Sequence, residues 1–108
     1  MSLNDKNIDI TKNIKVIEWL KSELLTAIAS LYELLAKGVQ NSHEAMLDIL
    51  SNIILVAYLL GKRLGASYES IDAKIEEKTK LGLVEDHKIE KWYGDLSDLL
   101  EYFKRKRG

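Results

Sequence analysis

The first long stretch of the chain repeats apolar residues at intervals of three and four. From about Thr11 to Lys37 the repeat forms a single row: Ile17, Leu20, Leu24, Ala27, Leu31 and Leu34. This spacing places the row on one face of an α-helix with a heptad period. A glycine just past a helix can take the left-handed conformation that ends it, and Gly38 stands there. The pattern predicts a long helix over 11–37 with one narrow buried face.

The second periodic stretch, about Ser42 to Leu64, is amphipathic at first and then apolar on every side from Ile53 to Leu60. A helix that is apolar all round is buried all round. Exposing three of its large aliphatic side chains would forgo roughly 5–9 kcal/mol of burial, comparable with the whole stability of a small domain. The helices of one chain cover one side well and the other only partly. We therefore expect a second copy to cover the rest, in a homodimer or homotetramer.

Shorter helices are predicted in the remainder of the chain. Ser67 is a suitable cap for a third helix over about 68–81, which Gly82 is expected to end. A short helix over about 86–93 follows, and Asp95 is expected to cap the last helix. The sequence thus predicts an all-α bundle of four to five helices that oligomerisation completes.

The domain organisation predicted from these patterns is simple. The chain of 108 residues has the length of one domain, which we place over 11–108. The polar stretch before it, over 1–10, has no apolar core of a signal peptide and is expected to be a disordered leader. The longest unbroken apolar run has eight residues, short of the roughly 20 that span a bilayer, so we predict no membrane segment.

Composition and charge exclude several functional classes. The chain has no cysteine, which excludes thiol nucleophiles and cysteine-bound zinc and fits a reducing cytoplasm. Sixteen basic and seventeen acidic residues give a net charge of −1, which argues against binding nucleic acid through bulk electrostatics. A basic run ends the last helix, from Lys104 to Arg107; it complements the helix dipole, with RNA binding as the alternative. No Gly-x-Ser-x-Gly elbow is present, so acyl transfer is excluded.

Two rows of polar side chains are the candidate site for chemistry. The first predicted helix carries Glu23, Thr26, Ser30 and Glu33 on one face, and the second carries Glu44, Asp48 and Asn52. Facing helices with carboxylates at such spacings can build a magnesium site, because hard cations need several oxygen ligands at once. The alternative is that both rows are solvated surface. For His43 and His87, near predicted helix starts, we expect surface or capping roles.

Two segments resemble a known family. The stretch NIILVAYLLGKRLGASYESIDAKIEEK, residues 52–78, and the stretch LYELLAKG, residues 31–38, are similar to the MazG-like proteins of the all-α nucleoside triphosphate pyrophosphohydrolase superfamily. The shared pattern is an apolar helix, an Arg-Leu-Gly turn and a charged helix containing Lys-Ile-Glu. The similarity covers about Trp19 to Lys80, more than half of the chain.

The resemblance implies a fold, an activity and a cofactor. Such proteins form a four-helix bundle by dimerisation and cleave a nucleoside triphosphate to the monophosphate and pyrophosphate. Their Glu-x-x-Glu and Glu-x-x-Asp motifs hold magnesium, which neutralises the phosphates and positions water for attack. In this chain the first motif falls on Ala27 and Ser30 and the second on Ile49 and Asn52. Alanine and isoleucine cannot ligate a metal, and serine and asparagine offer neutral oxygens.

The remaining candidate residues are those near the altered motifs. A shifted site would use Glu23, Glu33, Glu44 and Asp48 as magnesium ligands, with Asp48 and Glu44 as the catalytic residues. Nucleotide binding is assigned to Lys74 and Lys78; the family often has asparagine where Lys78 stands.

Two functional hypotheses follow, and whether the protein is an enzyme stays open between them. The first is a weak or degenerate magnesium-dependent nucleoside triphosphate pyrophosphohydrolase or nucleotide-binding protein. The alternative is a non-catalytic helical oligomer that acts as a scaffold or regulatory interaction module.

Overall fold

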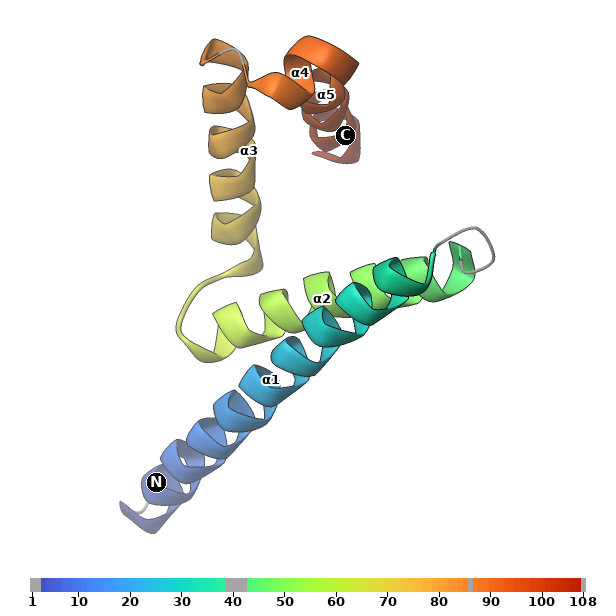
Figure 1. The fold of residues 1–108 in the computed structure, drawn as a ribbon. Helices are drawn as coiled ribbons and strands as arrows, with labels where there is room; N and C mark the ends of the chain where they lie inside the picture. Colours follow the sequence, from blue (N-terminus) through green and yellow to red (C-terminus); the bar gives the residue numbers. More distant parts are fainter. Residues whose placement is uncertain (1–2, 39–42, 86, 108) are drawn as a thin grey trace. The chain divides into compact units, whose positions relative to one another are not determined.

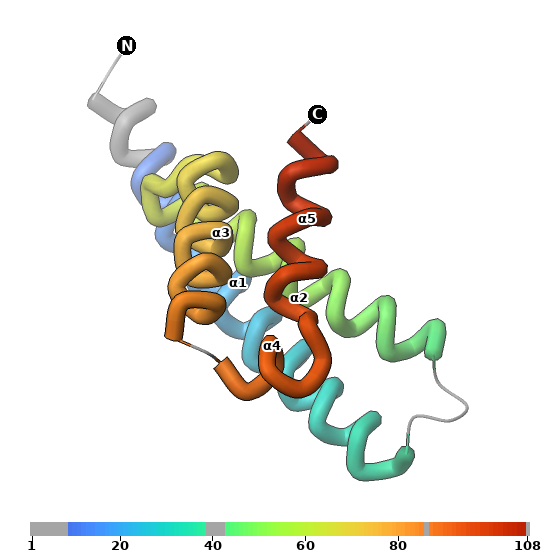
Figure 2. Tube along the Cα trace, turned by 90° about the horizontal axis from the view of Figure 1, so that it is seen from above, coloured from blue at the N-terminus to red at the C-terminus, as the bar shows by residue number. Residues whose placement is uncertain are grey.

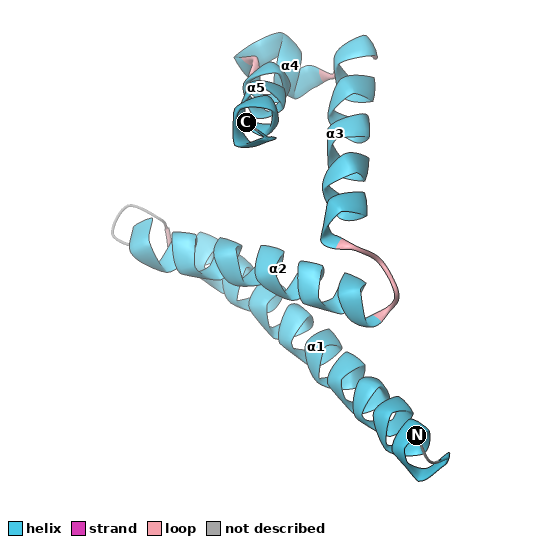
Figure 3. Cartoon of the chain, turned by 180° about the vertical axis from the view of Figure 1, so that it is seen from behind, coloured by secondary structure: helices cyan, strands magenta, loops and turns pink. Residues whose placement is uncertain are grey.

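The structure is a computed structural model that describes residues 3–38, 43–85 and 87–107. Its helices, in chain order, are α1 (Leu3–Lys37), α2 (His43–Arg63), α3 (Tyr68–Val84), α4 (Lys88–Tyr93) and α5 (Asp95–Arg107). The described residues contain five helices and no strand, joined by short loops (Figures 1 and 3). The predicted all-α class with four to five helices is confirmed.

Packing divides the chain into two compact units, Met1–Ser67 and Tyr68–Gly108. The first unit is a hairpin of α1 against α2. In the second, α5 packs against both α3 and α4. The single domain predicted over 11–108, with a leader over 1–10, stays a prediction.

Helix α1 is longer than the sequence predicted. It begins at Leu3, eight residues before the predicted beginning at Thr11. Extending a helix fixes one residue for each added hydrogen bond, which is far less costly than starting one. Polar residues such as those before Thr11 can therefore continue a helix that the apolar row has nucleated. That row is the buried seam: Leu20 is 2% exposed and Ala27 is 5% exposed.

A pair of hydrogen bonds fixes how α1 and α2 align. The side-chain amide of Asn13 donates to the backbone carbonyl of Arg63 (3.2 Å), and the Arg63 guanidinium donates to Asn13 Oδ1 (3.3 Å). Asn13, in the first third of α1, thus lies beside the end of α2, and the two helices run antiparallel (Figure 2). Residues that follow Asn13 along α1 therefore lie beside residues that precede Arg63 along α2.

Two glycines with positive φ end the helices of the hairpin. Gly38 has φ 89° directly after α1, as the sequence predicted. At the end of α2, Gly65 has φ 100°, its amide donates to the Lys62 carbonyl (3.2 Å), and the Ala66 amide donates to the Gly61 carbonyl (2.8 Å). This is a Schellman motif, which satisfies the last carbonyls of the helix.

The glycine that was expected to end α3 has another role. The helix continues past Gly82 to Val84. A Cβ atom at Gly82 would lie 2.7 Å from Leu96 Cδ1, closer than packed carbon atoms approach. The missing side chain therefore lets the first turn of α5 come close to α3. The sequence showed that a glycine was needed there, but it could not distinguish a helix end from a close approach.

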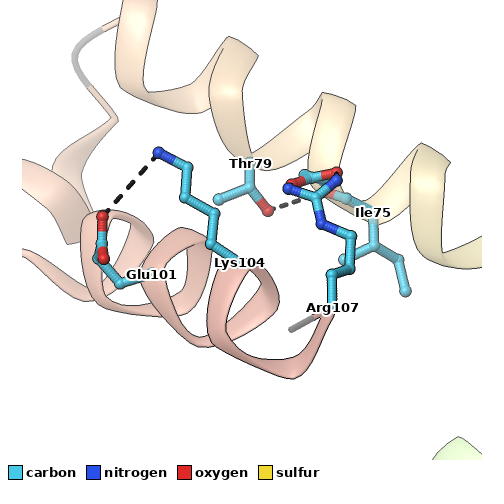
Figure 4. Close-up of polar contacts among 6 residues, drawn as sticks. Ile75, Thr79, Glu101, Lys104 and Arg107 are labelled. Carbon is cyan, nitrogen blue, oxygen red and sulfur yellow. Dashed lines mark hydrogen bonds and ion pairs between the residues drawn. The ribbon is translucent and has the colours of Figure 1, made fainter.

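Polar contacts of α3 lie at its packing surface with α5 (Figure 4). Thr79 is 4% exposed, and its hydroxyl donates to the Ile75 carbonyl one turn earlier (2.7 Å). The Arg107 side chain reaches from α5 to Glu76 on α3, with Nη1 2.9 Å from Oε2 and Nη2 2.8 Å from Oε1. The Glu76 side chain is only 12% exposed, so this ion pair is largely shielded from water.

Helix α4 is held by caps at both ends. His87 Nδ1 accepts a hydrogen bond from the Ile89 amide (3.1 Å), which confirms the capping role expected for this histidine. Gly94 ends the helix with φ 70°. Asp86, where the sequence placed the beginning of this helix, lies outside the described residues.

Glu90 of α4 accepts hydrogen bonds from the first turn of α5. Its carboxylate accepts the Ser97 amide (2.8 Å) and the Ser97 hydroxyl. These hydrogen bonds hold the pKa of Glu90 below its ordinary value, because they stabilise the charged form.

The apolar stretch Ile53 to Leu60 is covered on the side that faces α1. Val56 is 5% exposed, whereas Ile54 is 57% and Leu55 54% exposed. Among the described residues, α2 is the one helix that is long and apolar enough to cross a membrane, by length and composition alone. A helix buried between protein subunits passes the same test. The expected covering of this stretch by a second copy stays a prediction.

Candidate functional site

The four carboxylates predicted as metal ligands lie on one side of the α1–α2 hairpin. Successive residues of a helix turn by about 100°, so helix periodicity places each side chain relative to the line of contact between the helices. Glu23 and Asp48 lie to the same side of that line, and Glu33 and Glu44 lie further out. We define the polar face by these residues and their neighbours: Glu23, Thr26, Ser30, Glu33, Glu44, Asp48 and Asn52.

Within one chain these carboxylates are not gathered around a common point. Glu23 is half-buried, whereas Glu33, Glu44 and Asp48 are exposed. Glu33 Oε1 lies 3.9 Å from Lys37 Nζ, in an exposed pair on α1. Across the described parts of the chain, no three histidine, aspartate or glutamate side chains form a group that could hold a metal ion. The metal and catalytic assignments stay predictions.

Two positions to which the sequence analysis assigned the family motifs, one on each helix, lie at the same level of the hairpin. Ala27 lies fourteen residues after Asn13, and Ile49 lies fourteen residues before Arg63. The Asn13–Arg63 hydrogen bonds therefore bring Ala27 opposite Ile49 in the antiparallel pair. Ala27 is buried, and Ile49 is half-buried.

The other two positions to which the sequence analysis assigned the motifs carry neutral polar side chains. Ser30 and Asn52 stand there, and both are half-buried on the polar face. The four assigned positions therefore carry no charged side chain.

The two lysines predicted to bind nucleotide lie on α3, in the second unit. Lys74 Nζ is 3.1 Å from Glu77 Oε2 in an exposed ion pair one turn apart. Lys78 is also exposed, and helix periodicity places both lysines away from the side of α3 that carries Thr79 and Glu76. Their role in nucleotide binding stays a prediction.

A cavity of about 300 Å³ lies between α3 and α5. Its lining combines three carboxylates, two cations and two apolar side chains: Glu69, Asp72, Glu76, Lys106, Arg107, Ala73 and Phe103. The Glu76–Arg107 pair joins its two walls. Acidic residues near the start of α3 and basic residues at the end of α5 also complement the dipoles of these helices. The charges of this cavity therefore serve first to pack the two antiparallel helices.

The other side of the hairpin is apolar and exposed, a feature that the sequence analysis missed on α1. That analysis gave α1 one narrow apolar row, but a second row of the same spacing passes through Leu25, Ile28, Tyr32 and Leu35. The position of a side chain in a helix pair can be given as its rotation about the helix axis, measured from the line of contact. In an antiparallel pair of right-handed helices, side chains with the same rotation in the same sense lie on the same side of the pair. The second row of α1 therefore shares a side with an exposed row of α2. We define the apolar face by its large side chains: Leu25, Ile28, Tyr32, Leu35, Leu47, Leu50 and Ile54.

Exposure distinguishes this apolar face from ordinary surface. On α1, Leu25 is 71% and Tyr32 72% exposed, and on α2 the three large side chains are between 38% and 57% exposed. Scattered single apolar residues are normal on a surface, but a continuous patch over two helices is typical of an interaction site. The spacing of residues 25, 28, 32 and 35 could have indicated the second row of α1. It has the same heptad period as the buried row and lies beside it on the helix surface.

Comparison with known proteins identifies the family. The model of the MazG-like family matches residues 10–96, from the first third of α1 to the start of α5. No curated protein and no solved structure matches the chain. The match includes both helices of the hairpin and the segments at 31–38 and 52–78 on which the resemblance was based. Because the family pattern extends over most of its length, the chain belongs to the MazG-like family.

Proposed function

We propose that the protein is a self-associating MazG-like helical module that has lost the two-motif magnesium chemistry associated with related nucleotide-cleaving enzymes. The observation that carries this proposal is the pairing of Ala27 with Ile49 at the centre of the hairpin. Magnesium requires near-octahedral coordination by oxygen ligands, usually including one or two carboxylates. Side chains without oxygen at these two positions remove ligands that such a site needs.

Self-association is supported by the apolar face of the hairpin. Full burial of a large aliphatic side chain stabilises a protein by about 1.5–3 kcal/mol, and seven large side chains share this face. A partner with an apolar surface of matching shape therefore gains a large part of that free energy. A second copy always supplies such a surface, because both copies carry the same hairpin.

The enzymatic alternative is tested by incubating the purified protein with Mg²⁺ and a panel of canonical and modified nucleoside triphosphates. We expect no release of pyrophosphate above that of a blank reaction. Magnesium-dependent release that disappears in Asp48→Ala would contradict the proposal. Asp9→Ala, at an acidic residue far from the polar face along α1, is the matched control.

Nucleotide binding without cleavage is measured separately, by thermal unfolding with Mg²⁺ and a non-hydrolysable nucleotide. A ligand that binds only the native state at one hundred times its dissociation constant stabilises it by about 2.7 kcal/mol. We expect no change in the midpoint. If the midpoint rises, Lys74→Ala and Lys78→Ala show whether the predicted lysines are responsible.

A second candidate function is a shifted magnesium site on the polar face, completed by a second copy. It is favoured by the position of Glu23, which is half-buried on the same side of the hairpin as Asp48. Such a site predicts that Mg²⁺ alone raises the unfolding midpoint of the oligomer. Glu23→Gln and Asp48→Asn should each abolish that rise, whereas Glu18→Gln, at an exposed residue paired with Lys21, should preserve it.

A further inference from the structure

We propose that the cavity between α3 and α5 binds a small aliphatic diamine. In this assignment Glu69 and Asp72 receive its two ammonium groups, and Phe103 packs against the carbon chain between them. The cavity lies within the second compact unit. The proposal therefore does not depend on the self-association of the hairpin or on the polar face.

The size of the cavity limits the ligand to a small molecule. Its volume of about 300 Å³ is at the lower end of the range for small-molecule sites, which is about 300–1,000 Å³. Glu69 and Lys106 are exposed, whereas Asp72 and Phe103 are half-buried and the Glu76 side chain is 12% exposed. A small ligand can therefore enter from solvent and lose much of its hydration against the inner side chains.

One cation of the lining is already neutralised. Arg107 pairs with Glu76 through two contacts of 2.9 Å and 2.8 Å. Figure 4 shows Arg107 extending from α5 toward α3, so a cationic group is held against this wall of the cavity in the structure itself. The pair leaves two carboxylates and one lysine in the described lining.

The remaining charges favour a cationic ligand. The Lys106 ammonium lies 6.0 Å from the centroid of the Tyr102 ring, and Tyr102 is outside the set of described residues that line the cavity. Lys106 therefore contributes mainly its carbon chain to the wall. Glu69 and Asp72 then make the cavity acidic, which attracts an ammonium group and repels a phosphate or a carboxylate.

The spacing of these two carboxylates suits two ammonium groups on one ligand. Glu69 and Asp72 are three residues apart on α3, which separates them by about 4.5 Å along the helix axis on one face. Two ammonium groups joined by four carbons are separated by little more than one helical turn, about 5.4 Å. A carboxylate has several acceptor positions, so one that already accepts a hydrogen bond can accept another from the ligand.

The apolar wall distinguishes an organic cation from a metal ion. Phe103 and Ala73 line the same cavity, and an aromatic ring both packs against methylene groups and attracts an ammonium to its face. In the described parts of the chain, no three acidic or histidine side chains gather closely enough to hold a metal ion. Carboxylates that are separated in this way suit two charges on one carbon chain better than one compact ion.

Calorimetric titration at about pH 7 with three ligands of equal length tests the proposal. The ligands are diaminobutane with an amino group at each end, butylamine, and butanediol with a hydroxyl group at each end; only the amines are charged at this pH. We expect saturable binding of diaminobutane, weaker binding of butylamine and none of butanediol. Absence of saturable diaminobutane binding, or equal binding of butanediol, would overturn the proposal.

Glu69→Gln tests the assigned position of one ammonium group. The variant should weaken diaminobutane binding by about threefold to tenfold, to near the affinity of butylamine, because one of the two charge contacts is lost. Glu77→Gln is the matched control, since Glu77 is exposed on α3 and is outside the described lining. Equal weakening by both variants would show attraction to the general charge of α3 and would overturn the assigned site.

Phe103→Leu tests the aromatic wall. Leucine keeps an apolar side chain at this position but removes the ring, so both amines should bind more weakly and their ratio should stay unchanged. Circular dichroism establishes that each variant is folded before titration. If Phe103→Leu does not fold, Glu69→Gln and its control still decide the proposal, because residues 69 and 77 are exposed. Failure of amine binding leaves the proposed self-association standing, and a monomeric protein leaves the amine site standing.

Discussion

Asn13 of α1 and Arg63 at the end of α2 are joined by a pair of hydrogen bonds, although fifty residues separate them in the sequence. One bond uses the backbone carbonyl of Arg63, and the other uses its guanidinium. Because the carbonyl belongs to the last turn of α2, Asn13 both satisfies a helix end and fixes the register of the pair. This register is what brings Ala27 opposite Ile49.

Removing the Asn13 side chain should weaken the hairpin. We expect Asn13→Ala to lower the free energy of unfolding by about 0.5–1.5 kcal/mol, the usual net contribution of a hydrogen bond. The measurement is urea unfolding followed by circular dichroism. Lys12→Ala, at the neighbouring exposed position, is the control and should change stability by less than about 0.5 kcal/mol. Equal effects of the two substitutions would show that the Asn13 contacts do not hold the register.

The close approach of Gly82 to Leu96 predicts coupled effects of substitution. Alanine at a helix interior position is favoured over glycine by about 0.5–1 kcal/mol. In the natural sequence, Gly82→Ala places its Cβ against Leu96 Cδ1, so we expect that gain to be reduced or reversed. In a Leu96→Ala background the contact disappears, and Gly82→Ala should stabilise the protein by the full amount.

A double-mutant cycle measured by chemical unfolding gives the coupling between these two positions. A coupling free energy near zero would mean that the Leu96 side chain moves aside at no cost. Gly82→Val is a stronger test of this close approach, because its additional carbons also approach His87. We expect this variant to lose about 1–3 kcal/mol of stability.

The ion pair between Arg107 and Glu76 should contribute more than the other ion pairs of α5. The Glu76 side chain is 12% exposed, so Arg107→Ala leaves a poorly solvated carboxylate without its partner. Hydrogen bonds to charged groups contribute about 1.5–3 kcal/mol, and the exposure of Arg107 places the expected loss near the lower end. Lys104→Ala breaks an exposed 3.9 Å pair with Glu101 and should cost almost nothing.

The direction of this effect can be checked by removing both charges. Glu76→Leu combined with Arg107→Ala should recover much of the stability that Arg107→Ala alone loses, because the buried unpaired carboxylate is gone. Thermal unfolding of the natural protein, Arg107→Ala and the double variant provides the comparison. A double variant less stable than Arg107→Ala would contradict the assigned role of Glu76.

The cap that Glu90 provides for α5 should make stability depend on pH. Hydrogen bonds from the Ser97 hydroxyl and then the Ser97 amide lower the pKa of Glu90 below 4.5, against a smaller opposing effect of burial. Because its pKa is lower in the folded state, ionised Glu90 stabilises the folded protein in full at pH values above its unfolded-state pKa. This stabilisation is lost as the pH falls through the folded-state pKa.

Glu90→Gln is the variant that measures this contribution. The difference in unfolding free energy between it and the natural protein should be constant from about pH 7 to pH 5 and should shrink below about pH 4.5. Glu85→Gln, at an exposed residue after α3, is the matched control. A difference that grows on acidification would reverse the assigned sign.

Much of the fold could be predicted from local patterns, and the errors have a common cause. The seam through Leu20 and Ala27, the glycine end at Gly38 and the cap at His87 are determined by neighbouring residues, and all were predicted correctly. The beginning of α1 and the role of Gly82 were predicted wrongly. Both depend on contacts or cooperativity beyond a few residues, which a local pattern does not contain.

The same distinction between local patterns and long-range contacts applies to the candidate site. The sequence identified which polar residues stand on the two helices, because identity is local information. It also grouped Glu23 with Glu33, and Glu44 with Asp48, each pair on one helix face. It could not show whether the two helices bring these groups together, since that depends on the register between α1 and α2. The second apolar row of α1 was present in the sequence, but only the packing of α2 against the first row shows that the second stays exposed.

The sequence by itself determined that this protein is helical, where most of its helices end, and which residue types stand along each helix face. These properties follow from residue identity and from periodicity within single helices. Only the tertiary structure decided that Ala27 faces Ile49, that Gly82 admits Leu96, and that one whole side of the hairpin remains apolar and uncovered. The reason is physical: alignment between helices is fixed by a few long-range contacts, such as Asn13 with Arg63, whose partners cannot be recognised until the chain has folded.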